Sequence, residues 1–241
     1  MKAMIFAAGR GTRLGSITKD IPKALVEING IPVLEHTIRN LVRYGFDEII
    51  INIHHFGDQV IEFLRSKNNF GIEIMISDES NELLDTGGGL KKAAWFFEGG
   101  KPFLVHNVDV LSDLNLNSFF KAHLASEALA TLAVRSRKTV RYLLSDGNGV
   151  LCGWRNIKTG EEKIVRKNSG SLQELAFSGI HVISPGLLKK LPDKKVFSMI
   201  EVYLSLAAEN KIMTFNHDDT RWLDIGKPET LGLAEKMFPS L

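Results

Sequence analysis

The sequence lacks the features that mark disulfide-rich, nucleic-acid-binding and membrane-spanning proteins. It contains one cysteine, Cys152, so no disulfide can form within the chain. Its 30 lysines and arginines nearly balance its 28 aspartates and glutamates, so it lacks the basic excess that binds nucleic-acid phosphates. No apolar run approaches the roughly 18 residues of a membrane span, and we expect no signal peptide, because the apolar start is too short for its apolar core. We therefore expect a cytoplasmic protein with no nucleic-acid or membrane partner.

Apolar blocks of strand length alternate with segments of helical period in the first half. Strands are expected at 2–7, 48–53, 71–76 and 102–106, and helices at 33–44, from Asp58 onward and at 88–97. Such an alternation predicts an α/β fold with a doubly wound, mainly parallel, Rossmann-like sheet.

The second half has a different pattern. Strands are expected at 129–134, 142–145, 150–154, 176–183 and 211–215, and helices from Ser198 to Ala208 and from Pro228. The segment Asp146-Gly147-Asn148-Gly149 is typical of a hairpin turn. We therefore expect a small antiparallel elaboration here, within a single domain of residues 1–241.

A glycine loop follows the first strand, where an open α/β sheet binds its ligand. Gly9 and Gly11 let backbone amides face an anion, and Arg13 and Lys23 add two cations. This combination favours a polyphosphate ligand over a turn whose cations point into water. A dinucleotide fold is disfavoured, because the second strand ends in Ile53-His54-His55 without an acidic residue for the ribose.

Four motifs carry a resemblance to the sugar-1-phosphate nucleotidyltransferases. They are Gly9-x-Gly11-Thr12-Arg13-Leu14 with Pro22-Lys23, Leu84-Asp85-Thr86-Gly87-Gly88-Gly89, Val105-His106-Asn107-Val108-Asp109 and Trp222-Leu223-Asp224-Ile225-Gly226-Lys227-Pro228. The short length and the T-G-G-G segment look most like N-acetylmuramate 1-phosphate uridylyltransferases and short mannose-1-phosphate guanylyltransferases. In one departure, Val108 stands where the family usually has glycine.

The resemblance implies an enzyme that condenses a nucleoside triphosphate with a sugar 1-phosphate and releases pyrophosphate. It implies Mg²⁺ held by Asp109 and Asp224, with Arg13 and Lys23 as the catalytic cations on the phosphates. No general base is needed, because a phosphate monoester is already a nucleophile at neutral pH. The nucleotide is expected in residues 1–125 and the sugar in residues 126–241.

The resemblance also suggests contacts for each substrate. The expected nucleotide-binding residues are Ala8, Gly9, Gly11, Thr12, Glu82, Gly87 and Gly88, and the expected sugar-binding residues are Asn107, Arg141 and Gly179. Gly87 and Gly88 could instead be a flexible helix start, and Arg141 an exposed arginine at a strand edge.

The identity of the substrates stays open, because backbone contacts carry little information about the base. UTP with N-acetylmuramate 1-phosphate is the favoured pair. The alternatives are a GTP-dependent mannose- or heptose-1-phosphate guanylyltransferase, a choline-phosphate cytidylyltransferase and a non-catalytic nucleotide-sugar sensor. We expect a monomer or a small homo-oligomer.

Overall fold

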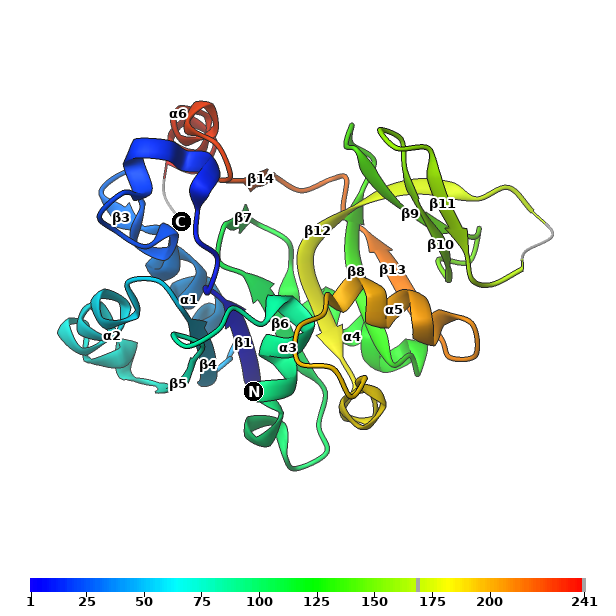
Figure 1. The fold of residues 1–241 in the computed structure, drawn as a ribbon, viewed down its shortest axis with the longest axis horizontal. Coiled ribbons are helices and arrows are strands. Elements are labelled where there is room, and N and C mark those ends of the chain that lie inside the picture. The colour runs from blue at the N-terminus through cyan, green and yellow to red at the C-terminus, as the bar shows by residue number, and fades with distance from the viewer. Residues whose placement is uncertain (168–169, 240–241) are drawn as a thin grey trace.

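Ten strands form one continuous sheet within residues 1–167 and 170–239, the part of the chain that the computed structural model describes (Figure 1). Eight of them follow the order β11-β10-β9-β12-β6-β1-β4-β5, while β8 pairs with β12 and β13 with β8. Their bounds are β1 (Lys2–Phe6), β4 (Glu48–Ile53), β5 (Glu73–Asp78), β6 (Phe103–Asn107), β8 (Ala130–Arg135), β9 (Arg141–Ser145), β10 (Leu151–Asn156), β11 (Glu161–Ile164), β12 (Gln173–Ile183) and β13 (Ile212–Asn216).

Helices cover both faces of the sheet. Along β1, Ala3 and Ile5 face one buried core and Met4 and Phe6 the other, because successive strand side chains alternate between faces. The first core is completed by α1 (Val33–Arg43), α2 (Gly57–Ser66), α4 (Leu116–Ser126) and α6 (Pro228–Met237), and the second by α3 (Asp85–Lys92) and α5 (Met199–Ala207). This layering is the doubly wound α/β arrangement that the sequence predicts.

The strands of the first half run parallel, and those of the second half are mostly antiparallel. β1 pairs in parallel with β4 and β6, and β4 with β5. The long strand β12 pairs antiparallel with β6, β8 and β9, so the antiparallel elaboration continues the central sheet. Its register shifts between Phe177 and His181, around Gly179 at φ +77°. The expected hairpin turn is confirmed, since β9 and β10 pair antiparallel across it.

Two boundaries differ from the expectation. The helix expected at 88–97 is α3 followed by a separate 3-10 helix, Ala94–Phe97. Asp58 does not cap α2; Phe56 occupies the N-cap position and Asp58 lies in the first turn. Among the described residues, every helix is too short or too polar to cross a membrane.

Short strand pairs outside the main sheet bring distant segments together. β2 (Glu27–Ile28) pairs with β3 (Ile31–Pro32), and β7 (Val110–Ser112) pairs with β14 (Trp222–Asp224). Figure 1 shows β14 running back from the second half of the chain toward the first, where α6 lies beside the amino-terminal loop. The chain therefore returns to the carboxyl ends of β1 and β6 just before its last helix.

Candidate active site

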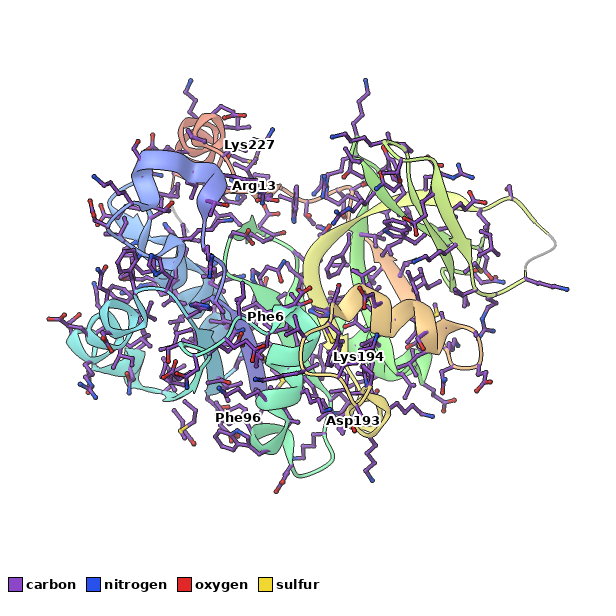
Figure 2. All side chains as sticks on the ribbon, viewed as in Figure 1. Phe6, Arg13, Phe96, Asp193, Lys194 and Lys227 are labelled. Carbon is purple, nitrogen blue, oxygen red and sulfur yellow. The ribbon has the colours of Figure 1, made fainter. Side chains whose placement is uncertain are left out.

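A cavity of about 450 Å³ lies beyond the carboxyl ends of β1 and β6. Phe6, the last residue of β1, borders it and lies near the middle of the molecule (Figure 2). Eight residues expected from the sequence to bind nucleotide, sugar or metal, or to act in catalysis, line it: Ala8, Gly9, Gly11, Thr12, Arg13, Lys23, Asn107 and Asp109. The structure thus places residues of the first motif and of the third motif around the same cavity.

Gly11 is held close to Lys23 by the fold of the amino-terminal loop. It has φ +64°, and a Cβ atom there would lie 3.0 Å from Lys23 Cβ and 3.1 Å from Thr18 Cγ2. The Thr18 hydroxyl donates to the Gly11 carbonyl at 3.0 Å. Glycine is therefore required both by the positive φ and by the close packing.

Lys23 forms an ion pair with Asp109. The pair joins Lys23 Nζ to Asp109 Oδ2, and the lysine is only 8% exposed. Lys23 begins a 3-10 turn, Lys23–Leu25, directly after Pro22, which is in an extended conformation. Because the lysine is buried among cavity-lining groups, its charge is directed at the cavity rather than into bulk water.

Asp224 is brought next to Asp109 by the pairing of β14 with β7. Asp224 is opposite Val110, and the Ile225 N–H donates to the Asp109 carbonyl at 2.8 Å. Burial raises the pKa of Asp224, and the charge of Asp109 raises it further, against the opposing effect of Lys23 and other nearby cations. Asp224 Oδ1 is buried and has no hydrogen-bond partner among the described residues. Two close carboxylates with an unpaired oxygen suit a hard divalent cation.

Gly226 allows Arg13 to approach Asp224. A Cβ atom on Gly226 would lie 2.7 Å from Asp224 Oδ1 and 2.9 Å from Arg13 Nη2. Figure 2 shows Arg13 near Lys227, at the start of α6. The first and fourth motifs therefore meet at a glycine with no space for a side chain.

A second cavity of about 620 Å³ lies among the strands of the second half. Asp85 borders both cavities, so they adjoin at the start of α3. The second cavity is lined by aromatic, amide and charged side chains, among them Arg137, Arg141, Tyr142, Trp154, Asn156 and Lys163. Such a mixture is suited to a polar ligand with an apolar face.

Comparison with known proteins decides the family. A family model described as nucleotidyl transferase matches residues 2–238. The chain belongs to the nucleotidyl transferase family. It is 31% identical to the N-acetylmuramate alpha-1-phosphate uridylyltransferase of Caulobacter vibrioides, over 97% of this chain and 95% of that protein. It is 28% identical to a mannose-1-phosphate guanyltransferase of Hypocrea jecorina, over 95% of this chain and 62% of that protein.

Solved structures share the fold of this nucleotidyl transferase. HddC from Yersinia pseudotuberculosis, complexed with GMP-PN, superposes with a TM-score of 0.76 over 98% of this chain and 99% of that chain, at 23% identity. Both the fold class and the resemblance to the sugar-1-phosphate nucleotidyltransferases are confirmed, and the chain is an enzyme of that class.

Three residues expected to bind nucleotide lie apart from the lining of the first cavity. The amides of Gly87 and Gly88 donate to the Phe197 carbonyl at 2.8 and 3.3 Å. A Cβ atom on Gly88 would lie 2.2 Å from the Lys195 carbonyl oxygen, so these glycines permit close packing of α3 against the segment before α5. Glu82 is exposed and forms an ion pair with Lys195.

Glu79 is a cavity-lining acid that the sequence analysis missed. It is 1% exposed, and it accepts hydrogen bonds from Asn52 Nδ2 at 2.7 Å and from the Leu84 N–H at 3.2 Å. Burial is the largest cause of its raised pKa, which these two hydrogen bonds partly offset. It directly follows Asp78, the last residue of β5, so its position at a strand end was an available signal.

The expected sugar-binding residues lie in two places. Asn107 lines the first cavity, and Gly179 packs against it, since a Cβ atom there would lie 2.9 Å from Asn107 Nδ2. Arg141 lines the second cavity and is exposed. Arg137, which the sequence analysis did not single out, lines the second cavity from a half-buried position.

Proposed function

We propose that the enzyme transfers a uridylyl group from UTP to N-acetylmuramate 1-phosphate or a similar sugar 1-phosphate. The observation that carries this proposal is the ion pair of Lys23 with Asp109 in the lining of the glycine-bearing cavity, with Asp224 held next to Asp109 behind that lining. The likeness to the Caulobacter vibrioides uridylyltransferase extends over 95% of that protein and supports this choice of substrates.

In the proposed reaction, a phosphate oxygen of the sugar 1-phosphate attacks the α-phosphorus of UTP. A new phosphorus–oxygen bond forms, the bond between the α-phosphorus and the bridging oxygen breaks, and pyrophosphate leaves with the electron pair. No proton needs to be removed from the nucleophile, so the enzyme's task is to hold several negative charges in line. Lys23 binds the reacting phosphates, and Arg13 with the amides near Gly11 and Thr12 binds the departing pyrophosphate.

We infer that Asp109 and Asp224 hold a Mg²⁺ ion. Bound there, the ion would neutralise charge on the reacting phosphates. Among the described residues there is no group of three or more acidic, histidine or cysteine side chains that could hold a metal. The two aspartates would therefore share the ion with phosphate oxygens and water, which is typical of magnesium sites in nucleotide enzymes.

The two adjoining cavities support separate binding sites for the nucleotide and for the sugar. The nucleotide would occupy the first cavity, which residues 1–125 line together with Val196 and Gly226, and the sugar the second, which residues 126–241 line together with Asp85. Asp85 lies where they adjoin, with φ +58°. Gly87 and Gly88 would support the nucleotide cavity through their packing against Phe197.

One observation favours a second candidate, a guanylyltransferase. Glu79 lines the first cavity with a buried carboxyl group whose oxygens accept hydrogen bonds from Asn52 and Leu84 and keep further lone pairs that can accept from a base. Guanine presents two adjacent donors on its Watson–Crick edge, whereas uracil presents one. The mannose-1-phosphate guanyltransferase of Hypocrea jecorina is a relative of this kind, and HddC, which shares the fold, has been solved in complex with GMP-PN.

A matrix of UTP, GTP, CTP and ATP against several sugar 1-phosphates and choline phosphate, read by pyrophosphate release with Mg²⁺, tests the proposal. We expect release with UTP and N-acetylmuramate 1-phosphate. Release confined to GTP would support the guanylyltransferase, and release confined to CTP with choline phosphate the cytidylyltransferase. No release with any pair would overturn a catalytic function and favour a sensor.

A further inference from the structure

The guanidinium group of Arg137 borders the second cavity and interacts electrostatically with Asp224. It stacks over the indole ring of Trp222, with Cζ 4.4 Å from the ring centroid. Trp222 belongs to β14, two residues before Asp224, and its indole N–H donates to the Ser178 carbonyl at 2.9 Å. Arg137 also lines the second cavity. Its charge is therefore held at the end of that cavity nearest the aspartate pair.

Most hydrogen-bonding capacity of Arg137 is unused. Its Nη2 donates to the Phe177 carbonyl at 3.1 Å. Its Nε is buried and has no partner among the described residues. A buried donor without a partner costs free energy that the rest of the fold must offset, and the groups left for a ligand are Nη1 and the second N–H of Nη2.

The positive charge of Arg137 is only partly neutralised by nearby negative charge. Burial lowers its pKa, the Asp224 carboxylate opposes this effect, and Arg135 adds to it. The carboxylate of Asp224 is itself shared with Lys23 and Arg13. An anion arriving beside Arg137 would therefore meet a partly desolvated guanidinium, which favours phosphate binding.

The other cations of the second cavity are less suited to this role. Arg141 is exposed, and Lys163 is exposed and forms an ion pair with Glu161 at 3.1 Å. Among the described residues, neither stacks on an aromatic ring as Arg137 does on Trp222. A rigid, half-buried arginine is better preorganised to bind a phosphate than a mobile surface cation is.

We propose that Arg137 binds the phosphate of the acceptor sugar 1-phosphate and orients it toward the α-phosphorus of the nucleotide. This inference rests on the proposed function, because it places the acceptor phosphate in the second cavity, beside Arg137. Nη1 and Nη2 carry the two parallel, outward N–H groups of the guanidinium, and Nη2 has a second N–H for the Phe177 carbonyl, so a phosphate can be held by two bonds while a third oxygen stays free to attack. Trp222 keeps the guanidinium plane fixed.

The test compares Arg137→Met, Arg137→Lys and Lys138→Met. Methionine keeps an apolar stem against Trp222 but has no charge, lysine keeps the charge but not the paired donors, and Lys138 is an exposed neighbouring cation. Isothermal titration calorimetry measures binding of N-acetylmuramate 1-phosphate, mannose 1-phosphate and inorganic phosphate without any turnover. Binding of UTP is measured in parallel, and thermal unfolding confirms that each variant folds.

We expect Arg137→Met to weaken binding of the phosphorylated ligands by about tenfold or more and UTP binding by less than about twofold. Arg137→Lys should fall between this variant and the wild type, and Lys138→Met should match the wild type. Equal weakening of UTP and sugar 1-phosphate would show a structural role for Arg137 and overturn the proposal, as would unchanged binding of both. If the wild type binds inorganic phosphate through Arg137 but releases no pyrophosphate with any substrate pair, the proposed function fails while the anion site stands.

Discussion

The Ile225 N–H donates to the Asp109 carbonyl at 2.8 Å, and this bond joins a motif from the middle of the chain to the motif that precedes its last helix. It lies beside the β7–β14 pairing, in which Asp224 is opposite Val110. Each aspartate alone would be an ordinary strand-end acid. Their backbone connection makes them neighbours regardless of how their side chains rotate, and it places both beside Lys23 and Arg13.

Replacing Lys23 by methionine should reduce turnover by a factor of hundreds, because loss of one charged donor to a reacting phosphate costs roughly 3–4 kcal/mol of transition-state stabilisation. Lys23 also forms an ion pair with Asp109. A water molecule in its place would carry no positive charge to balance that carboxylate. Steady-state pyrophosphate release measures the effect. Lys19→Met removes an exposed charge from the same loop and serves as the control. Wild-type turnover in Lys23→Met would exclude the role given to this lysine.

A methyl group on Gly226 should disturb the site without unfolding the protein. Its Cβ would lie 2.7 Å from Asp224 Oδ1, so the carboxylate must move. We expect Gly226→Ala to lower kcat by roughly a hundredfold, the usual result of misplacing a catalytic group by about an ångström.

Gly232→Ala is the matched control for that substitution. A Cβ atom there meets nothing within 4 Å, and Gly232 lies inside α6. It should keep full activity and gain about 0.5–1 kcal/mol of stability from better helix propensity. Equal activity in the two alanine variants would show that the space beside Asp224 does not matter.

Glu127 should be replaceable by glycine with a gain in stability. It ends α4 at φ +54°, a left-handed conformation that glycine adopts without steric cost. We expect Glu127→Gly to raise the free energy of unfolding by up to about 1 kcal/mol in urea titrations. Glu127→Ala removes the same charge but keeps the strain, so it should give no gain. A gain in both variants would point to the charge instead.

His123 should make the protein less stable in acid. It is 2% exposed and hydrogen-bonded to Thr131 and Ser184, and burial lowers its pKa to about 4 from 6.5. Between pH 4 and 6.5 this histidine is protonated in the unfolded chain but neutral in the folded one. The free energy of unfolding is therefore fully retained above pH 6.5 and falls as the pH is lowered toward 4. The loss reaches at most about 1.4 kcal/mol per pH unit for this histidine.

His123→Gln tests this pH dependence. Glutamine can still hydrogen-bond but does not titrate, so the free energy of unfolding should fall less steeply with acid in the variant than in the wild type. Urea unfolding at several pH values between about 4 and 6.5 gives both slopes. Parallel slopes would mean that His123 is protonated in the folded state as readily as in the unfolded one.

Much of the fold and part of the site could be predicted because their signals are local. The β-branched run of β4 and the strand-end position of Asp109 are visible in a few neighbouring residues. The course of β12 was not visible in this way. It begins at Gln173 rather than Ala176 and pairs with β6, β8 and β9, and pairing partners depend on packing between distant segments.

The remaining site residues depend on burial, which the sequence does not display. Glu79 and Glu82 lie in the same short segment, yet Glu79 is buried beside the cavity and Glu82 is paired with Lys195 at the surface. Gly88 resembles a ligand-binding glycine and is instead in close contact with the Lys195 carbonyl. The position of Arg137 is apparent only once β14 has placed Trp222 beneath it.

Titration of the protein with Mn²⁺, followed by electron paramagnetic resonance of the free ion, tests most directly whether Asp109 and Asp224 form one metal site. The measurement compares the wild type with Asp109→Asn, Asp224→Asn and the double variant. We predict that the wild type binds Mn²⁺, that each single variant loses nearly all of this binding, and that the double variant loses no more than either single one. Wild-type affinity in either single variant, or no binding by the wild type, would contradict the shared site.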